Sequence, residues 1–167
     1  MTAKITSISA REMMAERGTL GLQVTVTTDT GAVGVSTPSA GISTGIYEAA
    51  FVVDGGSRFG GTGQMQAVKN IETIIAPALI GMEVNRQREI DQLLCSLDGT
   101  PNKRKLGANA MVGVSLAVVK AAANAAGLPL YQYIGGSNAC IMPMPILSSQ
   151  APSGGSSSTS YRCQGPH

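Results

Sequence analysis

The sequence predicts an α+β fold, in which a three-stranded antiparallel meander is followed by a helical bundle. Up to about residue 36, apolar residues alternate with polar ones, and from residue 65 they recur at helical spacing. Strands that come first and helices that come after favour helices packed on one face of a small sheet. The 167 residues suffice for one domain with a core, but a (β/α)₈ barrel alone takes about 250, so no barrel is expected.

Three short strands are expected in the first part of the chain. Residues 4–10 have a mixed pattern, and residues 22–27 alternate between apolar and polar side chains. The string TDTG at 28–31 is a turn signal, so residues 33–35 should continue on a partner strand. The charged residues at 10–18 are predicted to connect the first two strands.

Three helices are expected next. An apolar face at 65–75 indicates a helix that ends near Pro77, because proline lacks the backbone N–H that a helix interior needs. Asn85 is predicted to cap a helix whose apolar residues recur over 90–97. The longest helix should cover 108–126, where glycine and proline follow and stop it.

The longest helix is apolar over most of its circumference. At 100° per residue, Asn109, Gly113, Lys120 and Asn124 fall within a stripe of roughly 60°. The pattern therefore predicts a buried core helix with one water-facing seam. The length alone would allow a membrane span, but the polar residues and many alanines argue against one.

Composition excludes several classes of function. The net charge is only +2 and no run of Lys or Arg occurs, so nucleic-acid binding has no support. Cys95, Cys140 and Cys163 are odd in number and lack metal or redox spacing, which indicates reduced thiols in a cytoplasmic protein. No apolar signal core follows the first residues.

Two glycine-containing loops precede the helices. Residues 37–49 are small and hydroxylated, which by composition alone fits either an ordinary surface loop or a functional one. Residues 54–63 lack the GxxxxGK[ST] pattern of a phosphate-binding loop. After Leu147 the composition becomes rich in Ser, Gly and Pro, so we expect a domain at 1–147 and a disordered tail at 148–167.

Several exact strings carry a resemblance to a known family. They are LDGT at 97–100, NK at 102–103, LGANA at 106–110 and GVSLA at 113–117. This run closely resembles a segment of the enolases (phosphopyruvate hydratases), and the order of features from about 5 to 147 is similar to their amino-terminal domain. The resemblance implies a small α+β domain that precedes a barrel. It also implies magnesium-dependent dehydration of 2-phosphoglycerate to phosphoenolpyruvate in cytoplasmic glycolysis.

The resemblance also implies roles for particular residues. The string PSAGISTG at 38–45, followed by YEA at 47–49, resembles the mobile active-site loop of the family. By that resemblance Ser43 contributes to the second Mg²⁺ ion, Gly41 and Gly45 act as hinges, and Arg17 lies at the interface of a homodimer. The other implied loop residues are Pro38, Ser39 and Thr44.

Two departures from the family pattern affect these implied roles. The loop is one residue longer than the usual PSGASTG, which can displace Ser43 by up to about 3.5 Å. Residues 19–21 read TLG where the family has Asn-Pro-Thr, and Gln23 stands where it has a Glu that helps pair subunits. Part of the interface network around Arg17 is therefore expected to be missing.

A third departure concerns the catalytic residues. In the family, the strand that resembles 143–147 leads into an Asn-Gly-Gly-x-His loop and the barrel, which carries the metal carboxylates, the general acid, the Lys base and the His. Here the string SSQ follows at 148–150, and His167 matches no family motif. We therefore expect no catalytic residue in this chain, weak or absent Mg²⁺ binding, no activity alone, and an origin in a truncated or frame-shifted gene.

Two alternative functions stay open. The chain could be a non-catalytic interaction domain that pairs with a full-length enolase or with a separately encoded barrel. It could also be a small relative of the superfamily that acts on another acid.

Overall fold

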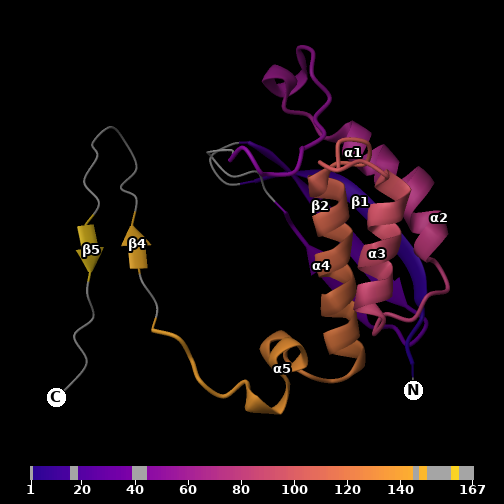
Figure 1. The fold of residues 1–167 in the computed structure, drawn as a ribbon, viewed down its shortest axis with the longest axis vertical. Coiled ribbons are helices and arrows are strands. Elements are labelled where there is room, and N and C mark those ends of the chain that lie inside the picture. Colours follow the sequence, from indigo (N-terminus) through magenta and orange to yellow (C-terminus); the bar gives the residue numbers. More distant parts are fainter. Residues whose placement is uncertain (1, 16–18, 39–44, 145–146, 150–158, 162–167) are drawn as a thin grey trace.

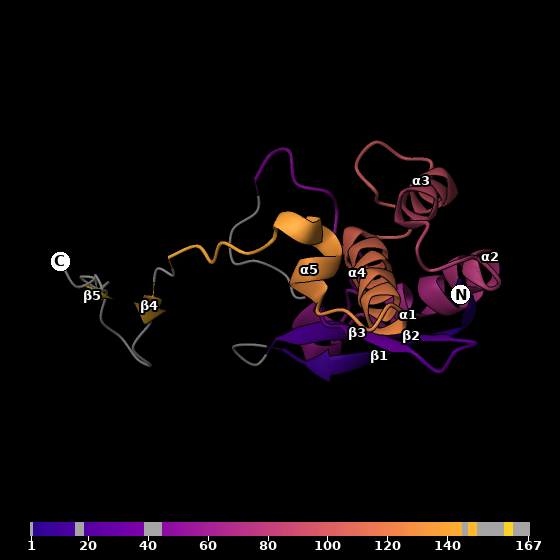
Figure 2. The same ribbon diagram turned by 90° about the horizontal axis from the view of Figure 1, so that it is seen from below.

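The structure is a computed structural model that describes residues 2–15, 19–38, 45–144, 147–149 and 159–161. Its main sheet is an antiparallel meander in the order β1-β2-β3, formed by β1 (Ile5–Met14), β2 (Leu20–Thr28) and β3 (Val33–Ser36). The helices lie on one face of this sheet (Figure 2). This arrangement confirms the predicted α+β class.

Strand β1 is longer than predicted. It continues to Met14 through residues that were expected to be a connection, and it pairs Glu12 with Leu22 and Met14 with Leu20. The prediction of a charged connection at 10–18 is therefore wrong for residues 10–14. The ladder with β2 satisfies the backbone polar groups there, and this outweighs the charged composition.

Strand β2 lies in the middle of the sheet and shows the predicted alternation. Leu22, Val24 and Val26 are buried on the face toward the helices, while Gln23 and Thr25 are only partly buried. This is the pattern of a sheet with one face against a core.

The first helical segment ends at Leu79, two residues beyond Pro77, so the predicted end near Pro77 is confirmed. It consists of α1 (Met65–Asn70), a π-helical turn (Ile71–Ile75) and α2 (Ala76–Leu79), with Pro77 near the start of α2. A proline at the start of a regular helical segment removes a donor that is unpaired in any case.

Helix α3 (Gln87–Asp98) begins without the predicted cap. Arg86, not Asn85, occupies the N-cap position, and no side chain caps the helix there. The guanidinium of Arg86 instead donates to the carboxylates of Glu83 and Glu89, at 3.0 and 3.1 Å. A turn held by charged side chains thus takes the place of a capping amide.

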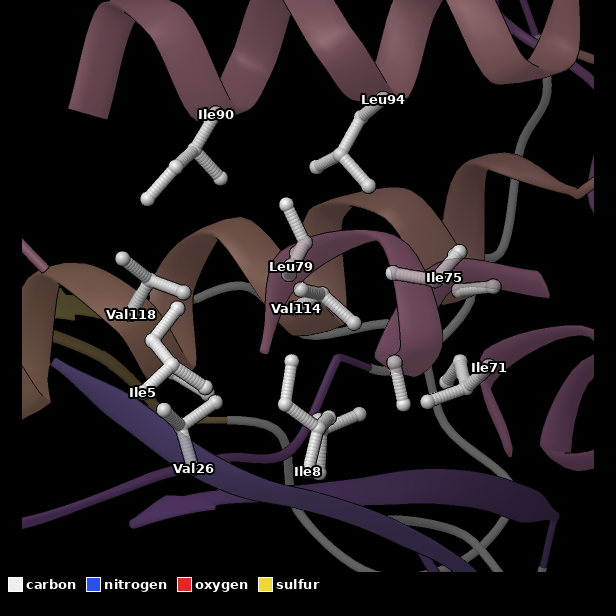
Figure 3. Close-up of a cluster of buried hydrophobic side chains, with 14 of the residues drawn as sticks. Ile5, Ile8, Val26, Ile71, Ile75, Leu79, Ile90, Leu94, Val114 and Val118 are labelled. Carbon is white, nitrogen blue, oxygen red and sulfur yellow. The ribbon is translucent and has the colours of Figure 1, made fainter. Parts of the chain in front are cut away.

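Helix α4 (Ala108–Ala125) lies between α3 and the sheet (Figures 1 and 2). The core between them is aliphatic. The sheet contributes Ile8 and Val26, α4 contributes Val114 and Val118, and α3 contributes Ile90 and Leu94 (Figure 3). By length and composition α4 could span a membrane, but 61% of it is buried inside the molecule, as is typical of a core helix.

The predicted water-facing seam of α4 is wrong for its first half. Asn109 and Gly113 are buried, while Lys120 and Asn124 are at least partly exposed. All four lie on the side of α4 that meets the strands and loops. The periodicity correctly placed these residues on one stripe, but it could not show what covers that stripe.

The remaining elements are short. They are 3₁₀ turns at Arg58–Gly61 and Gly136–Asn138, helix α5 (Leu130–Gly135), and the strand pair β4 (Leu147–Ser149) and β5 (Thr159–Tyr161). The two strands are the only part of 148–167 among the described residues, so the predicted tail stays a prediction.

Candidate functional site

The predicted active-site loop is only partly within the described residues. Pro38 and Gly45, which bound it, are described, whereas Ser39, Gly41, Ser43 and Thr44 lie outside the described residues. Arg17, the predicted interface residue, also lies outside them. The structure therefore tests the surroundings of the loop and leaves the predicted roles of these five residues as predictions.

The chain that enters the loop is held on helix α4. The hydroxyl of Ser36 donates to the carbonyl of Gly113 at 2.5 Å, and both residues are buried. The ring of Pro38 lies against α4 at Gly113, and its carbonyl accepts from the amide of Leu22 at 3.5 Å. Position 38 is thus held between the sheet and α4.

The chain that leaves the loop begins with an exposed turn. Gly45 donates its N–H to the carboxylate of Glu48, and its carbonyl accepts from the Glu48 N–H, both at 3.1 Å. Next to it, Ile46 and Tyr47 are 91% and 95% exposed. Gly45, expected to be a hinge, therefore lies in a turn with almost no packing of its own.

The same chain then reaches the start of α4. The amide of Ala50 donates to the carbonyl of Asn102, and its carbonyl accepts from the amide of Ala108, both at 2.8 Å. Two residues on, the Val52 amide donates to Asn109 Oδ1 at 3.2 Å, and Asn109 Nδ2 donates to the Val52 carbonyl at 2.9 Å. Residues 50–52 are therefore fixed by backbone and side-chain bonds.

Gln64 is a buried junction beside Asn109. Its Oε1 accepts from Asn109 Nδ2 at 3.0 Å, and its Nε2 donates to the carbonyl of Leu20 at 2.8 Å. Its backbone amide donates to Glu12 Oε1 at 2.5 Å. Both amide side chains have partners, which is what burial of polar groups requires.

An ion cluster covers the outer end of this junction. Arg58 donates to both carboxylate oxygens of Glu12 and lies 3.5 Å from Asp54 Oδ2. The hydrogen bond from Arg58 holds the pKa of Glu12 below its usual range, and the amides of Gln64 and Met65 act in the same direction. Asp54 accepts the first amides of α1, where the helix dipole favours a negative charge.

Asp98 organises the turn that leads into α4. Its carboxylate accepts the amides of Thr100, Lys105 and Leu106 at 2.9, 3.1 and 2.8 Å. Burial acts to raise the pKa of Asp98, but these amides and the Thr100 hydroxyl outweigh burial and lower it.

The described residues do not fit a Mg²⁺ site. Among them, no group of three His, Cys, Asp or Glu side chains is placed to hold a metal ion. Glu12 and Asp54 share Arg58, and Asp98 is saturated by backbone amides. Mg²⁺ prefers several oxygen ligands in octahedral geometry, so the described part of the chain supplies no such set.

Gln23 is engaged within its own sheet. Its Oε1 accepts from Arg11 Nε at 2.6 Å across the β1–β2 pair. A glutamine accepts this bond without the charge that a Glu would bring. The structure thus gives Gln23 a partner inside the chain, and the dimer predicted around Arg17 stays a prediction.

The predicted site omitted the residues that hold its ends. Asn109 was placed in a water-facing seam, and Gln64 was not singled out. Their spacing of 45 positions carries no short motif. The one signal was the LGANA string at 106–110, where a polar residue interrupts an apolar helix start.

These features define a class of protein. A small α+β domain holds both ends of a hydroxyl-rich segment on one buried helix, and the described residues contain no group of three side chains that could hold a metal ion. The class is therefore a small α+β domain whose residues 36 and 50, on either side of this segment, are bonded to its central helix.

Comparison with known proteins identifies the family. Residues 5–134 match the family described as "Enolase, N-terminal domain", so the chain belongs to the enolase family. It is 55% identical over 143 residues to an enolase of Thermococcus gammatolerans. This matched region covers 86% of this chain and 33% of that relative. It is 50% identical over 147 residues to an enolase of Methanothrix thermoacetophila, with 88% and 35% covered. The chain thus spans about a third of the length of the curated relatives it matches.

Proposed function

We propose that this chain serves the enolase reaction, the magnesium-dependent dehydration of 2-phosphoglycerate to phosphoenolpyruvate in glycolysis, as the domain that presents the active-site loop. The observation that carries the proposal is the match over residues 5–134 to the amino-terminal domain of enolases. The names of the relatives, at 50 to 55% identity, support the same reaction. We also propose that the chain acts in the cytoplasm, as expected from its reduced cysteines.

The chemistry explains why such a domain needs a partner. Removal of a proton next to a carboxylate builds up negative charge, which Mg²⁺ neutralises while a Lys or His base takes the proton. We propose that Ser43 supplies one oxygen ligand from this chain. One hydroxyl cannot hold Mg²⁺ on its own, so the isolated chain should bind the ion weakly or not at all and should not turn over substrate.

The experiment is an enolase assay with Mg²⁺ and 2-phosphoglycerate. The purified chain is assayed alone, with a separately expressed enolase barrel domain, and the barrel domain is assayed alone. We expect activity only in the mixture, and Ser43→Ala should then lower it, whereas Ser96→Ala, which changes an exposed serine of α3 outside the loop, should leave it unchanged. Turnover by the chain alone would refute the proposal that the catalytic groups lie outside it.

Exposed apolar side chains favour a second candidate function. On α4 and α5, Val112 and Leu116 are 48% and 44% exposed, and Tyr131 and Ile134 are 65% and 67% exposed. Apolar surface of this kind favours association. The chain could therefore be a non-catalytic partner of a full-length enolase, or pair with a second copy through Arg17.

Light scattering separates these assemblies. A 1:1 complex with full-length enolase whose turnover is unchanged would support the non-catalytic role. A dimer of the chain that is lost in Arg17→Ala would support pairing through Arg17. A monomer that binds neither partner would contradict both.

A further inference from the structure

Both chain segments that border residues 39–44 are attached to the first turns of α4. On one side Ser36 donates to the carbonyl of Gly113, and on the other the carbonyl of Ala50 accepts from the amide of Ala108. The two attachment points are five residues apart on the same helix. A rigid helix therefore sets the distance between the two ends of this segment.

Asn109 makes the attachment on the second side specific. It is fully buried, with 0% of its surface exposed. Its Oδ1 and Nδ2 bond the N–H and C=O of Val52, at 3.2 and 2.9 Å, as a neighbouring strand would. The second N–H of Nδ2 goes to Gln64 Oε1 at 3.0 Å, so each donor of the amide has an acceptor.

The surrounding residues fix the orientation of this amide. Gln64 cannot rotate freely, because its own Nε2 is committed to the carbonyl of Leu20 at 2.8 Å. Gly107 has a φ of +95°, and a Cβ there would lie 2.5 Å from Asn109 Oδ1 and 2.9 Å from the Val52 side chain. Only glycine fits at this position, which brings the backbone close to the amide.

We propose that Asn109 is a positioning residue for the enolase reaction. Its two bonds to Val52 fix the position of the backbone at Ala50–Val52 against the start of α4, and hence the position of the residues that precede Ala50. The inference rests on the proposed function for its catalytic consequence, but the positioning itself is a property of this chain. An apolar or shorter side chain at 109 would leave the N–H and C=O of half-buried Val52, and Oε1 of buried Gln64, without their side-chain partner.

The first test is amide hydrogen exchange on the full chain. In Asn109→Ala, we expect the Val52 amide to exchange faster than in wild type. The acceleration should be at least ten-fold larger than that of the core amides of Leu94 and Val118, which report global unfolding. The matched control is Asn124→Ala, which removes another α4 amide that donates to a backbone carbonyl, at 2.6 Å from Val33 O. It should leave the Val52 amide unchanged.

An equal acceleration at Val52, Leu94 and Val118 would overturn the proposal, because it would mean that Asn109 serves global stability alone. If Asn109→Ala does not fold, Asn109→Ser is measured in the same way, since its hydroxyl keeps one polar group at the site. These measurements need no substrate, so they stand even if the proposed function fails.

The second test uses the assay of the chain with the enolase barrel domain. We expect Asn109→Ala to lower kcat at least ten-fold while KM for 2-phosphoglycerate changes less than three-fold, because misplacement of a positioned group costs turnover. Asn124→Ala should keep both constants. Wild-type kcat in Asn109→Ala would overturn the catalytic part of the inference, whereas an inactive wild-type mixture would instead count against the proposed function.

Discussion

Helix α4 contacts the rest of the molecule differently at its two ends. At its start, a buried amide network ties together segments from β1, β2 and residues 50–64. At its end, the backbone of β3 lies directly on small residues, and Lys120 and Asn124 donate from the rim to the carbonyls of Val35 and Val33. The residues of one predicted stripe thus have different environments. At the buried start of α4 every polar group needs a hydrogen-bond partner in the protein, whereas at the exposed end water can take that place.

Steric contact at the end of α4 should give the largest effect on stability. A Cβ at Gly34 would lie 2.0 Å from the carbonyl oxygen of Ala117 and 2.3 Å from the amide of Ala121. These are backbone atoms that cannot move aside, so Gly34→Ala should lower the free energy of unfolding by about 3 kcal/mol or more. Urea denaturation measures this.

Gly45→Ala is the control for that substitution, because a Cβ there would meet nothing within 4 Å. It should change stability by less than about 0.5 kcal/mol. A Gly34→Ala variant as stable as Gly45→Ala would contradict the close packing of β3 on α4.

The two asparagines of α4 should differ in their effect on stability. Asn109→Ala removes the partner of the buried Gln64 side chain and of two half-buried groups of Val52, which should cost about 2 to 3 kcal/mol. Asn124→Ala exposes the Val33 carbonyl to water and should cost less than about 1 kcal/mol. Thermal unfolding of both variants measures the two losses of stability. Equal losses would mean that the buried and the exposed asparagine contribute alike, which would contradict the difference between the two ends of α4.

Acid should act first on the start of α4. The pKa values of Glu12 and Asp98 are lowered in the folded chain, so the unfolded chain binds protons more readily than the folded one. Their contribution to the free energy of unfolding is present above their pKa values in the unfolded chain, near pH 4. It is lost as the pH falls through their lower pKa values in the folded chain. Between pH 5 and 2, the protection of the Leu106 and Gln64 amides, relative to their exchange rates in an unfolded chain at the same pH, should therefore fall more than the protection of the Val35 amide.

Asp98→Asn sharpens the acid experiment. Loss of the charge should destabilise the chain at pH 7. The difference in stability from wild type should narrow as the pH falls below about 4, because there the Asp98 carboxyl of the unfolded wild-type chain takes up a proton before that of the folded chain does. A gap that is constant with pH would show that the charge of Asp98 contributes nothing.

A small effect is expected from the exposed end of α4. Lys120→Met removes a hydrogen bond of 2.9 Å to Val35 but keeps the aliphatic part of the side chain, so stability should fall by less than about 1 kcal/mol. The double variant with Asn124→Ala should accelerate exchange in β3 and leave Val52 protected. Loss of protection at Val52 would mean that the two ends of α4 are coupled.

Pattern-based prediction succeeded where one face of an element decides its position. The alternation over Leu22–Val26 gave β2 and its buried face, and the apolar run gave α4 within one residue of its observed end. It was wrong where a distant partner overrides local composition. Residues 10–14 are a strand because β2 pairs with them, and Arg86 replaces Asn85 because two glutamates hold it.

The amino-acid sequence by itself determined the α+β class, the central helix, the enolase family and the string that carries Ser43. These follow from periodicity and from short motifs, both of which are local. Only the tertiary structure decided that Asn109 is buried and holds Val52, and that Gln64 joins α4 to both β1 and β2. A buried amide must find partners wherever the fold brings them, and here those partners lie 45 and 57 positions away.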